Sequence, residues 1–496
     1  MRVSSWRRCR SASTSRCLTA RLRRGQPVTN PIRRKRGAHG NIGRTEPVAA
    51  TCWENVQSAT QKKRKAVDDE FKLYSTSVGD SGRVSVSRGH ATLTRAARCR
   101  CIPNAVLTDL KQRLSRVRFA DEFTDAGWDY GTNLAYLKGL VDYWRDKYDW
   151  RAQEKRLNEF DQFRTNIDGV DIHFIHQRSK NPNAMPLLLL NGWPSSIIEY
   201  EKVIGPLTDP AAYGGRVEDS FHVVIPAMPG FGFSGKPREK GYDPERIARM
   251  WVQLMARLGY TRYAAHGSDW GNGIATRVAL DDPTHVAALH LAGCGGAPAP
   301  AAASTGNPTP PVPLPNSAVN AAHNLGYQEI QSTKPQTLGQ GLSDSPVGLA
   351  SWIVEKWYGW SDHQGDMEKV FTKDELLTNI MIYWVTNSGT SSTRIYYESR
   401  HMLGGLAPTP FPRPEARVNV PTGCGSFPSQ YDRRGNLVDT SSPEARKAAE
   451  TRYNVVHFTT MQRGGHFPAF EQPKLWVDDI RAFFAAVHNS DRSRIR

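Results

Sequence analysis

Four short runs rich in aliphatic and β-branched residues stand out along the chain. They occupy residues 186–193, 221–228, 262–268 and 286–293. The last two are joined by a helix-like segment, residues 271–282, which stops at Pro283. Near-continuous apolar strands that alternate with helices are typical of a parallel sheet covered on both faces. This pattern predicts an α/β fold.

Helical patterns precede and interrupt the predicted core. Residues 102–180 place apolar side chains at three- and four-residue spacing, which predicts a helical meander packed against a larger body. Residues 295–316 are rich in Pro and Ala without periodicity, as in a linker, and residues 320–402 return to helical spacing. Two more strand-like runs, at 418–427 and 455–462, and a closing helix follow. We therefore expect a helical cap to interrupt the sheet, which then resumes.

These patterns divide the chain into five segments. They are a basic leader at 1–100, a meander at 101–180, the first part of the core at 181–295, a linker and cap at 296–402, and the second part of the core at 403–496. The leader carries the whole basic excess behind the net charge of +17, because it holds 23 Lys and Arg against 6 Asp and Glu while the rest of the chain holds 42 of each. Charge therefore gives the folded part no nucleic-acid signature.

The leader itself allows several interpretations. Its opening is rich in Arg and Ser and has no acidic residue before Glu46, which is typical of a mitochondrial presequence. A disordered or mispredicted leader is the alternative. The cluster QKKRK at 61–65 matches a nuclear or nucleic-acid signal, although so short a cluster is more often solvated charge. Nucleic-acid binding through this segment is the lowest-ranked hypothesis.

Cysteine usage and hydropathy restrict the compartment. Only Cys294 and Cys424 lie beyond the first 101 residues, and their spacing matches neither a zinc pattern nor a disulfide framework. The longest purely apolar run, Met185–Leu190, is far shorter than the roughly 20 residues that a membrane span requires. We expect a protein of a reducing compartment such as the cytoplasm, without a transmembrane segment or a metal site.

The stretch AHGSDWGNG, residues 265–273, has the spacing of small residues found in a nucleophile elbow, with Asp269 where a serine is common. A strand ending at Ser268 and a helix starting near Gly271 suit the sharp turn that exposes such a residue above a sheet. An acidic N-cap of that helix is the alternative. His466 lies after the last predicted strand, which matches the hydrolase order of nucleophile, acid and base. The pair favours catalysis.

A second motif, GFGFSG at 230–235, matches the glycine spacing of a dinucleotide-binding loop. That function requires a helix to begin at the last glycine. Pro237 and Gly241 follow instead, so we do not expect a dinucleotide cofactor.

Residues 102–490 resemble the microsomal-type epoxide hydrolases. The resemblance is carried by separate stretches: WDYGTNLAYLKGLVDYW, NGWPSS, MPGFGFSGKP, GSDWGNGIAT, GYQEIQSTKPQTL, DSPVGLASWIVEKW, TNIMIYW and RGGHFPAFEQP. It implies an α/β-hydrolase fold with a mostly parallel central sheet, helices on both faces, an inserted helical cap and an N-terminal meander. It also implies conversion of lipophilic epoxides to vicinal diols with water and without a cofactor.

The resemblance assigns roles to individual residues. Asp269 is the nucleophile that forms an alkyl ester with the substrate, and His466 activates the water that hydrolyses this ester. The backbone N–H groups of Trp193 and Trp270 form the oxyanion hole. Two cap tyrosines, matched here by Tyr327 and Tyr396, assist the epoxide oxygen.

The chain departs from the family at two points. Asn191 replaces the histidine of the His-Gly-x-Pro motif, which alters the support of the oxyanion loop. Gln430 stands at the position of the triad acid. Asp439 lies at about the family's spacing before His466 and is our first choice for that acid, with Asp432 second.

Two rival functions remain on the sequence. A haloalkane dehalogenase shares the aspartate nucleophile and would use Trp270 to hold halide, but the tyrosine pair argues against it. A non-catalytic binding protein on the hydrolase fold would explain Asn191, Gln430 and the altered cap.

Overall fold

The computed structural model describes residues 102–294, 316–401, 417–427 and 443–494, together with three short strands before them. These strands are β1 (Ser75–Val78), β2 (Val84–Ser87) and β3 (Thr94–Arg95). Strands β1 and β2 form a separate antiparallel pair.

Nine of the described strands form one sheet, in the order β11-β10-β9-β8-β6-β7-β5-β4-β3. Beyond β3 they are β4 (Gln162–Ile167), β5 (Val170–Gln177), β6 (Met185–Leu190), β7 (Phe221–Pro226), β8 (Tyr263–Gly267), β9 (Val286–Ala292), β10 (Val418–Ser426) and β11 (Tyr453–Thr460). The strands from β11 to β7 pair in parallel, and β5, β4 and β3 add an antiparallel edge. The predicted α/β-hydrolase fold is confirmed.

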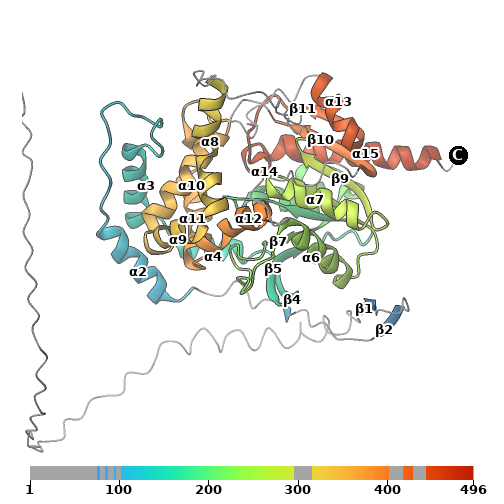
Figure 1. Ribbon diagram of the computed structural model, residues 1–496. Helices are drawn as coiled ribbons and strands as arrows, with labels where there is room; N and C mark the ends of the chain where they lie inside the picture. The colour runs from blue at the N-terminus through green and yellow to red at the C-terminus, as the bar shows by residue number, and fades with distance from the viewer. Residues whose placement is uncertain are drawn as a thin grey trace, which may run out of the picture. The chain divides into compact units, whose positions relative to one another are not determined.

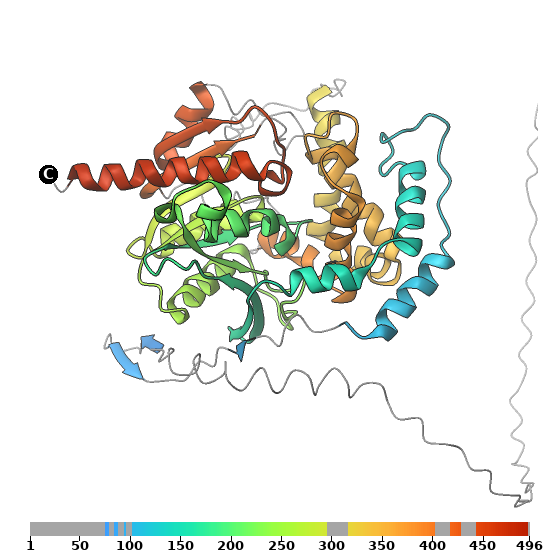
Figure 2. The same ribbon diagram turned by 180° about the vertical axis from the view of Figure 1, so that it is seen from behind.

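Helices cover both faces of the sheet, which explains the unbroken apolar runs of its central strands. Helices α6 (Pro244–Arg257) and α7 (Trp270–Asp281) pack together and lie in front of the sheet in Figure 1. Helix α15 (Pro473–Arg494) packs with α5 (Glu201–Thr208) and lies in front in the opposite view of Figure 2. All residues of β7 and β8 are buried, as expected for strands covered on both sides.

The segment 102–180 is only partly helical. It contains α2 (Asn104–Ser115), α3 (Leu134–Asp146) and α4 (Trp150–Leu157), which contact the cap helices. Residues 162–177 instead form the hairpin β4–β5, so the prediction of an entirely helical meander is wrong there. Asp168 and Gly169 form its two-residue turn with φ of 54° and 80°. Asp-Gly between two apolar runs is a strong hairpin signal that helical periodicity obscured.

The cap is inserted in the sequence between β9 and β10. Its helices are α8 (Asn316–Thr333), α9 (Pro335–Asp344), α10 (Pro346–Trp360), α11 (Lys373–Val385) and α12 (Gly389–His401), grouped beside the sheet in Figure 1. A capping box of Thr372 and Glu375 starts α11. The predicted Pro/Ala linker lies almost wholly outside the described residues. Among the helices that are described, none is long and apolar enough to cross a membrane.

Cys294 and Cys424 form a disulfide, with their Cα atoms 5.4 Å apart. The expectation of two unpaired thiols is therefore wrong. The cysteines are 130 residues apart in sequence, but Cys294 lies two residues after the end of β9 and Cys424 lies in the neighbouring strand β10. Sequence spacing gave no sign of this pairing because the entire cap lies between them.

Candidate active site

The elbow places Asp269 between β8 and α7 at φ 52°, a conformation that non-glycine residues seldom adopt. Neighbouring glycines make this turn possible. A Cβ atom at Gly267 would lie 2.1 Å from the carbonyl oxygen of Gly271, and one at Gly271 would lie 2.0 Å from that of Leu190. The spacing of small residues seen in the sequence is therefore a packing requirement of the turn.

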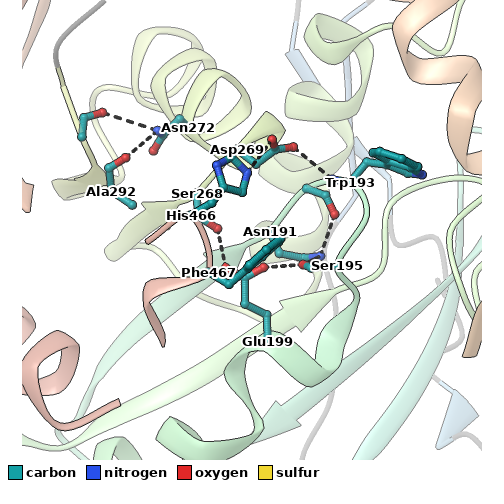
Figure 3. Close-up of polar contacts among 12 residues, drawn as sticks. Asn191, Trp193, Ser195, Glu199, Ser268, Asp269, Asn272, Ala292, His466 and Phe467 are labelled. Atoms are coloured by element: carbon teal, nitrogen blue, oxygen red, sulfur yellow. Dashed lines mark hydrogen bonds and ion pairs between the residues drawn. The ribbon is translucent and has the colours of Figure 1, made fainter. Parts of the chain in front are cut away.

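The Asp269 carboxylate is held between two donors (Figure 3). Oδ1 accepts a hydrogen bond of 3.0 Å from the backbone N–H of Trp193, and Oδ2 lies 2.9 Å from Nε2 of His466. Within the described part of the chain the side chain does not cap α7, which contradicts the N-cap alternative. Gly192 is required here because a Cβ atom would lie 1.8 Å from Oδ1.

The loop that carries His466 is fixed against the end of cap helix α10. The backbone N–H of His466 donates to the carbonyl oxygen of Trp360 at 2.8 Å. A Cβ atom at Gly465 would lie 2.5 Å from the same oxygen, so this close approach needs glycine. The buried carboxylate of Glu471 accepts from the backbone N–H groups of Phe467 and Asp362. Cap and core together orient the imidazole.

The charge around His466 favours its protonated form. Burial lowers the pKa of the imidazole, but the hydrogen bond to Asp269 and the charges of Asp269, Glu199 and Glu471 outweigh burial. The pKa of His466 is therefore raised above its ordinary value of 6.5. The protonated form of His466 therefore persists to higher pH than that of a free histidine.

Behind the pair, a buried polar cluster joins the oxyanion loop to the elbow. Glu199, on the short 3₁₀ helix Ile197–Tyr200, accepts hydrogen bonds from the hydroxyls of Ser195 and Ser268. The amide of Asn191 donates to the Ser195 hydroxyl and to the Gly192 carbonyl, as Figure 3 shows. Asn191 thus supports the loop from within, at the position where the family has histidine.

The cap holds the same loop from the other side. Two residues of α11 bond to its carbonyl oxygens, Asn379 to Pro194 at 2.7 Å and the hydroxyl of Tyr383 to Ser195 at 2.5 Å. The backbone that presents the Trp193 N–H is therefore fixed by both core and cap, which is the preorganisation that an oxyanion hole requires.

Glu199 makes stability depend on pH. Burial raises its pKa from 4.5 to about 7, although the two serine hydrogen bonds work against the rise. A raised pKa means that its contribution to stability is full below pH 4.5 and is lost as the pH rises through about 7. Between pH 5 and 8 the wild-type free energy of unfolding should fall, relative to Glu199→Gln, by up to about 3 kcal/mol. Urea unfolding at both pH values measures this, and an equal difference at each pH contradicts it.

The two cap tyrosines meet over the elbow. The ring centroid of Tyr327 lies 5.5 Å from that of Trp193, and Tyr396 lies 4.9 Å from Trp270 and 5.7 Å from Tyr327. Tyr397 instead stacks on His401 at 3.9 Å. Burial raises the pKa of both Tyr327 and Tyr396, and the charge of Asp269 adds to the rise. Both remain protonated donors at neutral pH.

The triad acid stays a prediction, because Asp439, Asp432 and Gln430 lie outside the described residues. Trp270 is the first residue of α7, and its N–H is placed at the elbow by that helix start.

The glycine-rich stretch Gly230–Gly235 does not lead directly into a helix. The next helix begins only at Pro244, as the sequence led us to expect. No group of three or more potential metal ligands occurs among the described residues.

Two carboxylates of the site were missed from the sequence. Glu199 is the one charged residue in the buried run SIIEY, and Glu471 ends the short helix Pro468–Glu471 that follows the histidine loop. A carboxylate inside a buried run signals a structural or functional partner, because an unpaired buried charge is costly. The sequence carried that signal for Glu199, but it did not show which residues are its hydrogen-bond partners.

Known proteins are similar to this chain in sequence and fold. Residues 99–200 match the family described as "Epoxide hydrolase N terminus", and residues 185–325 match "alpha/beta hydrolase fold". The chain is 43% identical over 385 residues to a "Putative epoxide hydrolase" of Stigmatella aurantiaca (strain DW4/3-1), covering 77% of this chain and 83% of that protein. It is 37% identical to "Epoxide hydrolase 1" of Sus scrofa, covering 77% and 86%.

Solved structures agree. Juvenile hormone epoxide hydrolase from the silkworm Bombyx mori matches with a TM-score of 0.66 at 29% identity, covering 80% of this chain and 95% of that one. Aspergillus niger epoxide hydrolase matches with a TM-score of 0.63 at 28% identity, covering 80% and 97%. With its α/β-hydrolase sheet, its cap and an elbow aspartate paired to a histidine, the chain belongs to the epoxide hydrolase family of the α/β-hydrolase superfamily and is an enzyme of that family.

Proposed function

We propose that the enzyme converts lipophilic epoxides to vicinal diols through a covalent ester on Asp269. The observation that carries this proposal is the position of the Asp269 carboxylate, between the imidazole of His466 and the backbone N–H of Trp193, under the phenols of Tyr327 and Tyr396. This arrangement supports the roles of nucleophile for Asp269, base for His466, oxyanion donor for Trp193 and proton donors for the two phenols.

In the first step, one oxygen of Asp269 attacks a ring carbon of the epoxide, and the C–O bond of the strained ring breaks. The leaving oxygen stays on the substrate and becomes a hydroxyl. A bare alkoxide is a poor leaving group, so Tyr327 and Tyr396 bond to this oxygen and supply the proton. The product is a hydroxyalkyl ester of Asp269.

In the second step, His466 removes a proton from water, which attacks the carboxyl carbon of Asp269. Ester formation neutralises the charge of Asp269, and this charge is a main cause of the raised pKa of His466. The pKa of the imidazole then falls, so His466 gives up its proton to solvent. The neutral imidazole is then able to accept a proton from the attacking water. The oxyanion of the intermediate forms beside the N–H of Trp193, with the N–H of Trp270 as second donor. The intermediate collapses as the His466 imidazolium passes a proton to the departing diol oxygen, which releases the diol and restores the Asp269 carboxylate. The phenol that donated in the first step is reprotonated from solvent.

Aromatic walls favour a lipophilic substrate. The rings of Trp193, Trp270, Tyr327, Trp360 and Tyr396 pack against one another beside the Asp269–His466 pair. Such walls bury apolar substituents and leave only the two phenols and the carboxylate to recognise the epoxide. Asp439, with Asp432 second, remains our proposal for the acid that orients His466.

The ester route is tested by one turnover of styrene oxide with enzyme in excess, in water labelled with oxygen-18. The ester route puts the label into the Asp269 carboxylate, and the first diol contains none. Direct attack of water on the epoxide puts the label into the diol and contradicts the proposal. Halide release from a haloalkane, without diol from epoxides, would reassign the site to dehalogenation. Binding of styrene oxide without adduct or diol would support a binding protein.

The two phenols should act redundantly. Tyr327→Phe or Tyr396→Phe alone is expected to slow ester formation about 10- to 100-fold, because the other phenol still donates, and the double variant about 10³-fold or more. Rapid acid quenching followed by intact-mass spectrometry measures the rate. Tyr397→Phe is the matched control because Tyr397 stacks on His401, and its rate should stay within about twofold of wild type. A double variant that forms the ester at the wild-type rate would remove the phenols from the mechanism, and one no slower than the single variants would contradict their redundancy.

A further inference from the structure

A buried lysine lies against one of the two phenols. Lys356, on cap helix α10, is 4% exposed, and its Nζ lies 4.6 Å from the ring centroid of Tyr327. The same Nζ lies 5.8 Å from the ring centroid of Trp360, one helical turn further along α10. Its ion-pair partner is the adjacent Glu355, at 2.5 Å, whose side chain is 33% exposed.

This lysine occupies a position that would ordinarily be apolar. Its neighbours on α10 include the buried residues Ile353, Val354 and Trp357. Burial of an ammonium group is unfavourable unless other groups compensate its charge, and lysine is among the residues least often fully buried. A methionine of similar shape would fill the same space without that cost. The charge itself therefore calls for a reason.

The position of Nζ over the ring suggests one. The face of an aromatic ring is negative, and a cation within about 6 Å of its centroid is attracted to it. The attraction grows as negative charge develops on a phenol that is donating its proton. Burial and the charge of Asp269 raise the pKa of Tyr327, which makes it a reluctant donor, while a hydrogen bond with Tyr396 lowers the pKa. A fixed cation on the ring face opposes the first two effects.

We propose that Lys356 is a positioning residue for epoxide opening, which acts through the ring of Tyr327 to favour proton donation to the departing oxygen. This inference rests on the proposed ester mechanism and on the assignment of Tyr327 as a donor. It concerns only ester formation, because water attack on the ester involves His466 and the oxyanion hole rather than the phenols.

The test compares Lys356→Met, which keeps the volume and removes the charge, with Lys356→Arg, which keeps the charge. Single turnovers of styrene oxide, quenched with acid and followed by intact-mass spectrometry, give the rates of ester formation and ester hydrolysis separately. We expect Lys356→Met to slow ester formation about 10- to 30-fold, because it removes a cation–π interaction from a desolvated site, and to leave ester hydrolysis within about twofold. Lys356→Arg should retain ester formation within about threefold.

A double-mutant cycle separates action through Tyr327 from general damage. In a Tyr327→Phe background, Lys356→Met should change ester formation by less than about twofold, because the phenol it assists is gone. A more acidic phenol, introduced by substituting 3,5-difluorotyrosine for Tyr327, should restore ester formation in the Lys356→Met protein. Equal slowing in both backgrounds, or no rescue, would assign Lys356 a purely structural role.

A second variant keeps the ammonium and leaves the buried packing unchanged. Glu355→Gln removes the counter-charge, which itself raises the pKa of Tyr327. Ester formation should then quicken about twofold, and slowing would contradict the inference. If wild-type enzyme forms the Asp269 ester and Lys356→Met forms it equally fast, only this inference fails. If the wild type forms no ester, the proposed mechanism fails with it.

Discussion

Asp269→Asn is expected to lower the rate of epoxide hydrolysis by roughly 10⁴-fold or more, the largest effect of any single change in this protein. The amide has nearly the shape of the carboxylate and keeps the elbow intact, so the loss measures chemistry rather than folding. A neutral amide oxygen is a much weaker nucleophile and forms no stable ester. The steady-state rate of diol formation and an intact-mass spectrum after mixing with styrene oxide provide the measurement.

The matched control for this change is Asp478→Asn. Asp478 lies on α15, its side chain is 48% exposed, and its partner is the exposed Lys474. This variant should retain wild-type activity and the full mass adduct. If Asp269→Asn forms the adduct at the wild-type rate, the nucleophile is another residue and the ester assignment is wrong.

His466→Gln is expected to separate the two chemical steps. Ester formation should stay within about tenfold of wild type, because attack on the epoxide needs the carboxylate and not the base. Hydrolysis of the ester should slow about 10³-fold, because no group is left to activate water. The enzyme should therefore show a burst of about one epoxide consumed per active site, release almost no diol, and accumulate a mass increase equal to the whole epoxide.

His285→Gln serves as the control, since His285 is a half-exposed side chain paired with Asp282 near the start of β9. It should show neither the burst nor the trapped adduct. Loss of ester formation in His466→Gln, with no adduct at any time, would mean that the histidine is needed to align or charge the nucleophile rather than to activate water.

The parts of the fold and site that were predictable are those encoded by neighbouring residues. Asp269 could be found because its strand, turn glycines and helix lie within nine residues, and the sterics of Gly267 and Gly271 enforce that spacing. The parallel strands were predictable because burial on both faces demands unbroken apolar runs. The position of His466 was predictable because it follows the last parallel strand, and the ends of parallel strands lie at the edge of the sheet that carries the elbow.

The parts that were not predictable depend on contacts between distant segments. The hydrogen bonds by which Glu199 joins the oxyanion loop to the elbow could not be predicted, because one of its partners, Ser268, is 69 residues away. Lys356 was not singled out from the sequence, because only the tertiary arrangement of the cap helices places it on the ring of Tyr327. The hairpin β4–β5 was lost among flanking helices, although its Asp-Gly turn is a local signal that the sequence carries.

The disulfide between Cys294 and Cys424 has a consequence for how this protein could be altered. It closes the segment between the two cysteines into a covalent loop whose ends are held 5.4 Å apart, one two residues after β9 and the other in the neighbouring strand β10. Because the two ends of the inserted segment are fixed beside each other, the sheet can keep the same structure for an insert of a different sequence or length. The two connections between cap and sheet are thus a suitable place to replace the cap. A different cap with its own substrate pocket could be inserted there, while the elbow and the histidine loop remain on the sheet.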